Sequence, residues 1–337
     1  MTRRRTGRAQ AWAELLRVSA LFSVPGDALA GAAAAGVRPG RGTLCAIGAS
    51  LCLYEAGMAL NDWADRAEDA AERPHRPLPS GRIAPGAALA ASAALTAAGL
   101  ALASRAGRPP LAVATALAAT VWAYDLGLKH TPAGPGTMAT ARALDLLLGA
   151  TASTGGNGGP HHRAVHALPS AALLGAHTYA VTAVSRHETQ GGSTRTPLAA
   201  LAVTLAVAGA TAGEGLGGRP DTTTVSSASG PPTPHPHPHP RPTLPSRRLL
   251  SSRRPHPSRG LGPLLALAYA RTPATLLLHA ALNPSAALTE RAVGGGIRAT
   301  IPLQAALSAR AGAPGTALAL LGLVPAARAL ARKVSPT

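Results

Sequence analysis

Long apolar runs recur along nearly the whole of this 337-residue chain and restrict what it can fold into. Each approaches the roughly 20 residues that an α-helix needs to cross the hydrocarbon core of a bilayer. They occupy residues 17–37, 43–61, 84–104, 109–128, 138–153, 168–185, 197–213, 262–282 and 315–331. A shorter run at 296–310 predicts a partial helix. We therefore predict an all-α fold, a polytopic transmembrane bundle of about eight or nine helices.

The composition agrees with a surface that largely faces lipid. Charged residues make up only 14% of the chain and hydrophobic residues 46%, whereas a soluble domain carries about a quarter charged residues. A soluble alanine-rich bundle is the alternative, and it would show charged faces at the helical period. The run from Ala88 to Leu102 contains no charged residue, which argues against that alternative.

The formal net charge of +18 comes almost entirely from arginine. Such a charge suits either nucleic acid or an anionic membrane surface. The arginines lie mainly between the apolar runs, and no pattern of interleaved aromatic and basic residues typical of RNA binding is present. We therefore expect membrane lipid, and no nucleic acid, as a partner.

Composition divides the chain into four segments. Residues 1–13 form a basic N-terminus, which the positive-inside rule places in the cytoplasm. Residues 14–213 are predicted to form the first part of the bundle, and 261–337 the remaining helices and the C-terminus. Residues 214–260 are rich in Pro, His, Ser and Arg and contain few residues that build a core, which predicts a disordered loop.

Three polar connections, at 62–83, 129–142 and 185–196, follow the second, fourth and sixth predicted helices. With a cytoplasmic N-terminus all three return to the cytoplasmic side. We therefore expect one mouth of the bundle to collect them.

The first connection begins with an acidic pattern in which Asn61, Asp65 and Asp69 are spaced i, i+4, i+8. On a helix this spacing places the three side chains on nearly one face. Mg²⁺ prefers oxygen ligands and commonly bridges carboxylates to substrate phosphates. Carboxylates at a membrane edge are costly unless they bind something. A solvated acidic turn is the alternative interpretation of the spacing alone.

The stretch from Asn61 to Ile83, including the "RPLPSG" sequence at 76–81, resembles the first aspartate-rich motif of the UbiA superfamily of membrane prenyltransferases. The resemblance implies that Asn61, Asp65 and Asp69 bind Mg²⁺ on a prenyl diphosphate. It also implies that Arg73 and Arg76 face the diphosphate, to which a guanidinium can bond bidentately.

A second stretch, "YDLGLK" from Tyr124 to Lys129, resembles the tyrosine-and-lysine segment of the same superfamily. The resemblance implies catalytic roles for Tyr124 and Lys129, the latter as an electrophilic group beside the leaving diphosphate. A lysine that extends along a helix end to the membrane surface is the alternative. The following loop and Arg142 also resemble the family, which implies substrate binding by Arg142.

The third stretch departs from the common family pattern. Residues 185–192 contain no DxxxD motif, and Glu188 is their only acid. This "SRxExxGG" form resembles the EboC-type branch of the superfamily, as do the "YDLxLK" segment and the run from Arg17 to Gly31. We expect Glu188, with water, to serve as a further metal ligand and Arg186 to bind substrate. Asp27, inside the first apolar run, is expected to face the bundle interior, where it borders the acceptor pocket or is simply hydrogen-bonded.

Taken together, the resemblance implies a multi-pass prenyltransferase of the inner (plasma) membrane with its active-site loops on the cytoplasmic side. Its cofactor would be Mg²⁺, and its substrates a prenyl diphosphate and a lipophilic or aromatic acceptor. A non-catalytic lipid-binding or transport-accessory protein on the same fold is the alternative that the missing DxxxD motif supports. CDP-alcohol phosphotransfer is a weaker alternative, because Trp63 rather than glycine follows Asp62. The oligomeric state, acceptor and prenyl length are not set by these patterns.

Overall fold

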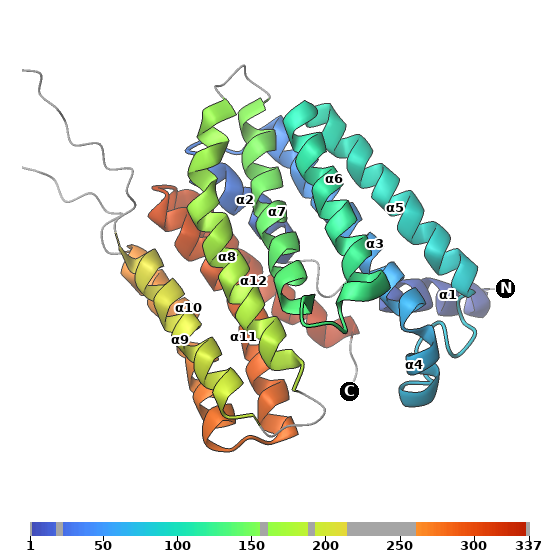
Figure 1. Cartoon of the computed structure of the whole chain (residues 1–337). Helices are drawn as coiled ribbons and strands as arrows, with labels where there is room; N and C mark the ends of the chain where they lie inside the picture. The colour runs from blue at the N-terminus through green and yellow to red at the C-terminus, as the bar shows by residue number, and fades with distance from the viewer. Residues whose placement is uncertain (1, 18–22, 156–160, 188–192, 214–260, 335–337) are drawn as a thin grey trace, which may run out of the picture.

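A computed structural model describes residues 2–17, 23–155, 161–187, 193–213 and 261–334 (Figure 1). This part of the chain is helical and contains no strand. The helices are α1 (Thr2–Leu15), α2 (Val24–Ala34), α3 (Arg41–Ala64), α4 (Arg66–Glu72), α5 (Pro85–Ala106), α6 (Arg108–Ala123), α7 (Gly134–Gly155), α8 (Leu168–Ser185), α9 (Arg195–Ala212), α10 (Leu261–Leu282), α11 (Ala286–Arg310) and α12 (Pro314–Val334). A π-helical turn, η2 (Tyr124–Leu128), continues α6, and a 3₁₀ segment, η3 (His161–Ala167), precedes α8.

Six of the described helices are long and apolar enough to cross a membrane. They are α3, α5, α6 with η2, α8 with the end of η3, α9 and α10. The predicted transmembrane helix bundle is therefore confirmed, whereas a count of eight or nine spanning helices is not. The predicted loop at 214–260 and the predicted ligand Glu188 lie outside the described residues.

The predicted partial helix at 296–310 is wrong, because α11 begins at Ala286 and has 25 residues. Packing explains why the run of three glycines at 294–296 stays helical. Gly295 lies against Leu276 of α10, and Gly296 lies against Val181 of α8. A side chain at either glycine would collide with these neighbours, so small residues here let α11 approach both helices.

The helices pack mainly as neighbouring pairs. α3 lies along α5, α7 contacts α2, α6 and α8, and α10 contacts α9 and α11. The backbone of α2 meets that of α7 closely, where Gly31 lies against the Leu146 carbonyl and Gly149 against Ala28. Close backbone approach at small residues is how helices associate in lipid, where the hydrophobic effect does not drive them together.

The loop after α4 is tied to the N-terminal helix. Arg82 donates to both carboxylate oxygens of Glu14 of α1, at 2.7 and 3.1 Å, and to the His75 carbonyl at 2.6 Å. The hydrogen bond to Glu14 raises the pKa of the Arg82 guanidinium above its ordinary value. Leu78 and Ile83 of the loop pack on Leu15. The segment that carries Arg73 and Arg76 is therefore held against α1 and α3.

Candidate active site

The three polar connections predicted to share one mouth do meet at one end of the bundle. A cavity of about 420 Å³ opens there. Its charged lining contains one carboxylate, Asp65, and five side chains that are cationic at neutral pH. These five are Arg17, Arg73, Arg76, Lys129 and Arg186. Because the cations outnumber the acid so strongly, the cavity is suited to a polyanionic ligand.

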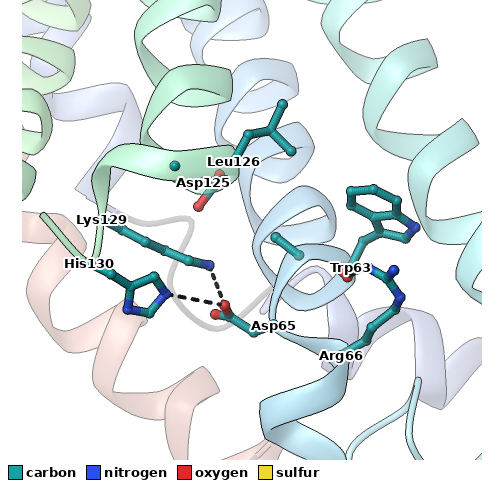
Figure 2. A pocket seen from close by; sticks show the side chains of 9 residues that line it. Trp63, Asp65, Arg66, Asp125, Leu126, Lys129 and His130 are labelled. Atoms are coloured by element: carbon teal, nitrogen blue, oxygen red, sulfur yellow. Dashed lines mark hydrogen bonds and ion pairs between the residues drawn. The ribbon is translucent and has the colours of Figure 1, made fainter.

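Asp65 lies at the centre of the polar contacts in this cavity, and Figure 2 shows its contacts with Lys129 and His130. Its Oδ1 forms an ion pair with the Lys129 ammonium and lies 3.9 Å from His130 Nε2. Its Oδ2 accepts a hydrogen bond from Asn61 Nδ2 at 3.2 Å. The Lys129 side chain is only 9% exposed, so its charge is poorly screened by water.

The π-helical turn η2 explains how Lys129 comes to face Asp65. The Lys129 amide donates to the Tyr124 carbonyl, five residues earlier, at 3.0 Å. This wider turn changes the direction of the side chains that follow α6, and such turns are frequent at functional sites. Tyr124 and Lys129 thereby line the same cavity, as the resemblance of "YDLGLK" implied.

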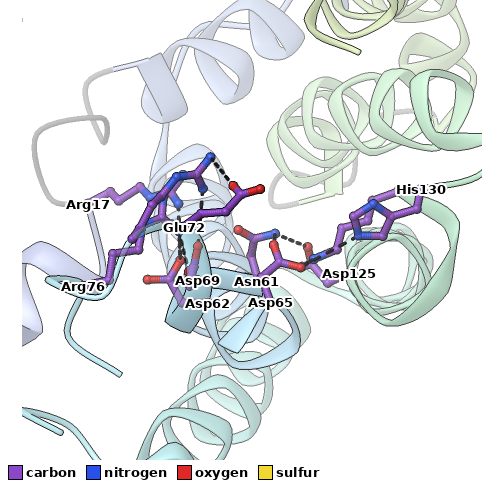
Figure 3. A network of polar contacts seen from close by, with 11 residues as sticks. Arg17, Asn61, Asp62, Asp65, Asp69, Glu72, Arg76, Asp125 and His130 are labelled. Atoms are coloured by element: carbon purple, nitrogen blue, oxygen red, sulfur yellow. Dashed lines mark hydrogen bonds and ion pairs between the residues drawn. The ribbon is translucent and has the colours of Figure 1, made fainter. Parts of the chain in front are cut away.

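A second group of acids lies beside the first and is held by arginines (Figure 3). Arg76 Nη1 lies 2.7 Å from Asp69 Oδ2 and 3.6 Å from Asp62 Oδ1. Arg73 Nη1 lies 3.4 Å from Asp69 Oδ1, and Arg17 Nη2 lies 3.3 Å from Asp62 Oδ1. The Asp69 side chain is only 2% exposed. These ion pairs aim Arg73, Arg76 and Arg17 along the edge of the cavity that all three line.

The predicted single face of Asn61, Asp65 and Asp69 is divided between these two groups. Helix α3 ends at Ala64, Asp65 caps it, and α4 begins at Arg66. Asn61 and Asp65 contact each other, whereas Asp69 contacts the arginines and does not line the cavity. The interruption at Asp65 turns the acids of α4 away from the line that a continuous helix would follow.

One group of side chains in the described ranges has the spacing of a metal site. Ligand atoms of Asp65, Glu68 and His130 all lie within 4.8 Å of one another. Two oxygen donors and one imidazole nitrogen suit a divalent cation. Glu68 and His130 were missed from the sequence, because only folding brings residues 68 and 130 together. The structure thus supports Asp65 as a metal-ligand candidate and adds two neighbours.

A smaller cavity of about 220 Å³ (Figure 2) shares Asp65, Lys129 and His130 with the larger one. Its lining includes Trp63, Leu126 and the buried carboxylate of Asp125, which accepts a hydrogen bond from Asn61 Nδ2 at 3.3 Å. Asp125 was not selected from the sequence although it lies inside the "YDLGLK" stretch. Only the geometry of η2 shows that it faces Asn61.

Arg142 and Asp27, both predicted to bind substrate, contact each other inside the bundle. Arg142 Nη1 lies 2.6 Å from Asp27 Oδ2, and Gln304 of α11 donates to Asp27 Oδ1 at 2.6 Å. Asp27 is fully buried, and neither residue lines the two cavities described above. Arg186, the other predicted substrate-binding residue, does line the larger cavity and donates to the Thr131 carbonyl.

The chain is similar in sequence to three curated proteins named digeranylgeranylglyceryl phosphate synthase. The protein of Methanothrix thermoacetophila is 40% identical over 108 residues, which are 32% of this chain and 39% of that protein. The protein of Methanopyrus kandleri is 34% identical over 128 residues, which are 36% of this chain and 45% of that protein. The protein of Korarchaeum cryptofilum is 34% identical over 149 residues, which are 44% of this chain and 53% of that protein. The chain thus spans about half, or less, of the length of these relatives.

Two solved structures share the fold. One comes from work titled "Structural and mechanistic insights into the biosynthesis of Digeranylgeranylglyceryl phosphate synthase in membranes" and has a TM-score of 0.56 at 14% identity, covering 90% of this chain and 98% of that one. The other is a UbiA homolog from Aeropyrum pernix K1, with a TM-score of 0.56 at 15% identity, covering 85% and 96%.

The family assignment rests on a further match, to a known protein family. The UbiA prenyltransferase family matches residues 20–213, which is more than half of the chain. Neither this match nor the relatives distinguish the EboC-type branch within the superfamily. With the transmembrane helical fold and the acidic and basic residues gathered at one mouth, the chain belongs to the UbiA prenyltransferase family.

Proposed function

We propose that this multi-pass membrane protein transfers a prenyl group from a prenyl diphosphate to a lipophilic or aromatic acceptor. The observation that carries the proposal is the cavity in which five cationic side chains and the single carboxylate of Asp65 meet at the mouth of the bundle. Family membership supports the same reaction class. A diphosphate is the part of a prenyl donor that such a cavity suits, because its charges match several guanidinium groups.

The arginines bind and orient the diphosphate in this proposal. Arg73 and Arg76 line the cavity and form ion pairs with Asp69, which does not line it. Asp69 therefore acts as a positioning residue. Arg186 approaches from α8, and its bond to the Thr131 carbonyl holds it across the mouth. Binding from opposite sides fixes the diphosphate, which leaves the prenyl chain to extend into the bundle.

Lys129 and Tyr124 act on the reacting centre. The bond between the first prenyl carbon and the bridging oxygen breaks, and the diphosphate leaves with the electron pair. Lys129 stabilises the negative charge that grows on the leaving oxygen, and the ring face of Tyr124 stabilises the carbocation character of the carbon. The acceptor nucleophile then bonds to that carbon and releases its proton to water or to the departed diphosphate.

The residues near Asp65 fit a magnesium ion. Asp65 and Glu68 offer carboxylate oxygens at the required mutual distance, and the Asn61 amide contacts Asp65. A hard cation takes oxygen ligands of this kind and keeps some of its water. Mg²⁺ would neutralise charge on the diphosphate, with Asn61, Asp65 and Glu68 holding it. Glu188, two residues after Arg186, remains the predicted further ligand.

The basic residues at this mouth support its placement on the cytoplasmic side of the inner (plasma) membrane. Positively charged connections are retained on the cytoplasmic side. Arg66, Arg73, Arg76, Lys129 and Arg186 all lie at this end of the described helices. In the opposite orientation these positively charged residues would have to be moved across the membrane, which the positive-inside rule disfavours.

The proposal is tested by incubating the purified protein in vesicles with a radiolabelled allylic diphosphate, Mg²⁺ and a lipid extract that supplies acceptors. Wild type should form labelled lipid, and Asp65→Asn should not. Glu72→Gln is the matched control, because Glu72 is exposed at the end of α4 and does not line the cavity. Diphosphate binding without any labelled product would favour the non-catalytic lipid-binding alternative.

A further inference from the structure

Arg271 occupies an unusual position for a charged residue. It lies midway along α10, a 22-residue helix that is long and apolar enough to span the membrane. At 1.5 Å per residue, about 15 Å of helix separates it from either end. This distance is about half the thickness of the hydrocarbon core, so an extended arginine side chain falls short of both headgroup layers.

The surface around Arg271 is otherwise apolar and uncovered. Three leucines lie on the same helix face as Arg271, because they are four or seven residues away from it: Leu264, Leu267 and Leu278. These leucines are 64%, 65% and 41% exposed, and Arg271 is exposed as well. In Figure 1, α10 and α9 form an outer edge of the bundle. This face of α10 therefore meets lipid or a partner.

No acidic group within the described residues compensates the charge of Arg271. Among the described residues, Arg271 has no side-chain hydrogen bond or ion pair, and neither α9 nor α10 contains an Asp or Glu. An unpaired arginine at this depth is costly and marks a functional position. The apolar core cannot supply an anion, so the compensating charge must come from another membrane-embedded group.

The neighbouring helix allows close approach at the same depth. Gly262 of α10 lies near the Thr211 carbonyl of α9, and this register puts Ala202 of α9 at the level of Arg271. Ala202, Ala206 and Gly209 are exposed on α9, and a side chain added at Gly209 would meet nothing within 4 Å. Small exposed residues of this kind let a further helix pack closely.

We propose that the outer face of α9 and α10 around Arg271 docks a membrane-spanning helix of another protein, with an Asp or Glu near its middle. Charge complementarity specifies this occupant. A second copy fits poorly, because a two-fold interface on this face would bring two Arg271 side chains together. An anionic lipid fits poorly, because its charge lies at the bilayer surface rather than at mid-depth.

A model peptide tests the proposal directly. Full-length protein with a donor dye on an N-terminal tag is reconstituted in phosphatidylcholine vesicles. Acceptor-labelled Leu/Ala spanning helices carry Asp or Leu at their centre. Energy transfer should show that the Asp peptide binds wild type roughly tenfold more tightly than the Leu peptide. Arg271→Leu should remove this preference, whereas Arg105→Leu, at an exposed arginine in the last turn of α5, should keep it.

Exchanging the charges of Arg271 and of the peptide gives a second test that does not depend on the Arg271→Leu variant. Arg271→Asp should prefer a peptide with a central Arg over the Asp peptide. Equal binding of the Asp and Leu peptides to wild type would overturn the proposal, and so would a preference that survives Arg271→Leu. Loss of the preference when phosphatidylglycerol is added would show that lipid headgroups neutralise Arg271 and would also overturn it. Energy transfer between two copies that disappears in Arg271→Leu would identify a second copy as the occupant and reject the proposal.

Discussion

The Lys129 ammonium forms an ion pair with Asp65 Oδ1, the same oxygen that lies 3.9 Å from His130 Nε2. Lys129 therefore already occupies the carboxylate oxygen through which Asp65 would bind a metal ion. Under the proposed function, a metal ion would compete with this ammonium for the carboxylate in the substrate-free protein. A bound diphosphate would give the lysine an alternative anionic partner and so free Asp65.

Replacing Lys129 with methionine should tighten metal binding and weaken catalysis at the same time. Removing the competing ammonium should lower the dissociation constant of Mn²⁺ in the substrate-free protein by about threefold to tenfold, in line with ion pairs worth around 1 kcal/mol. Electron paramagnetic resonance of free Mn²⁺ measures this constant. Arg186→Met, which lines the same cavity but bonds a backbone carbonyl, should leave it unchanged. Weaker Mn²⁺ binding by Lys129→Met would contradict competition.

Asp69→Asn should lower both substrate affinity and stability. Asp69 is almost fully buried and holds Arg73 and Arg76, so its loss frees two guanidinium groups that the cavity needs in place. Because both arginines are partly exposed, the expected cost in unfolding free energy is only about 1–2 kcal/mol. Thermal unfolding in detergent and binding of a non-hydrolysable prenyl diphosphate analogue measure the two effects. An unchanged affinity would remove Asp69 from the positioning role.

The buried pair of Arg142 and Asp27 should prove essential to the fold. Arg142→Met leaves the Asp27 carboxylate buried without its cation, which costs about 3–5 kcal/mol in comparable cases. Arg142→Met combined with Asp27→Leu removes both charges and should recover much of that loss. Unfolding of wild type and the two variants in detergent gives the comparison. If the double variant folds but no longer accepts the prenyl acceptor, the predicted substrate-binding role gains support beside the structural one.

Glu188→Gln should reduce turnover strongly if this residue supplies the acid that the absent DxxxD motif supplies elsewhere. Raised Mg²⁺ should then rescue part of the activity, because one carboxylate with water can still hold the ion. The measurement is the Mg²⁺ dependence of prenyl transfer in wild type and variant. Identical curves for both would reject the ligand role.

Deleting Gly218 to Ser258 and inserting a short Gly/Ser bridge should leave membrane insertion and activity largely unchanged. The segment contains few residues that can build a core, and loop length alters closure entropy only slowly. Accumulation of the variant in membranes and its prenyl transfer rate provide the check. A variant that does not accumulate would show that the segment is structural.

The residue patterns alone determined the class of fold and the family. Apolar runs of spanning length specify membrane helices because bilayer thickness sets their length, and the structure confirms this class. The motifs around Asn61 and Tyr124 indicated the family, which the match over residues 20–213 confirms. Local sequence is enough to predict the fold class and the family, because helix length and motif identity both depend on residues that are neighbours in the chain.

Only the tertiary structure decided how the charges are paired. Nothing in the spacing shows that Lys129 meets Asp65, that Gln304 reaches Asp27, or that η2 turns Asp125 toward Asn61. Each contact joins helices far apart in the sequence. Helical periodicity specifies which face a residue occupies on its own helix, whereas the close approach of backbones at residues such as Gly149 and Gly31 decides which faces meet.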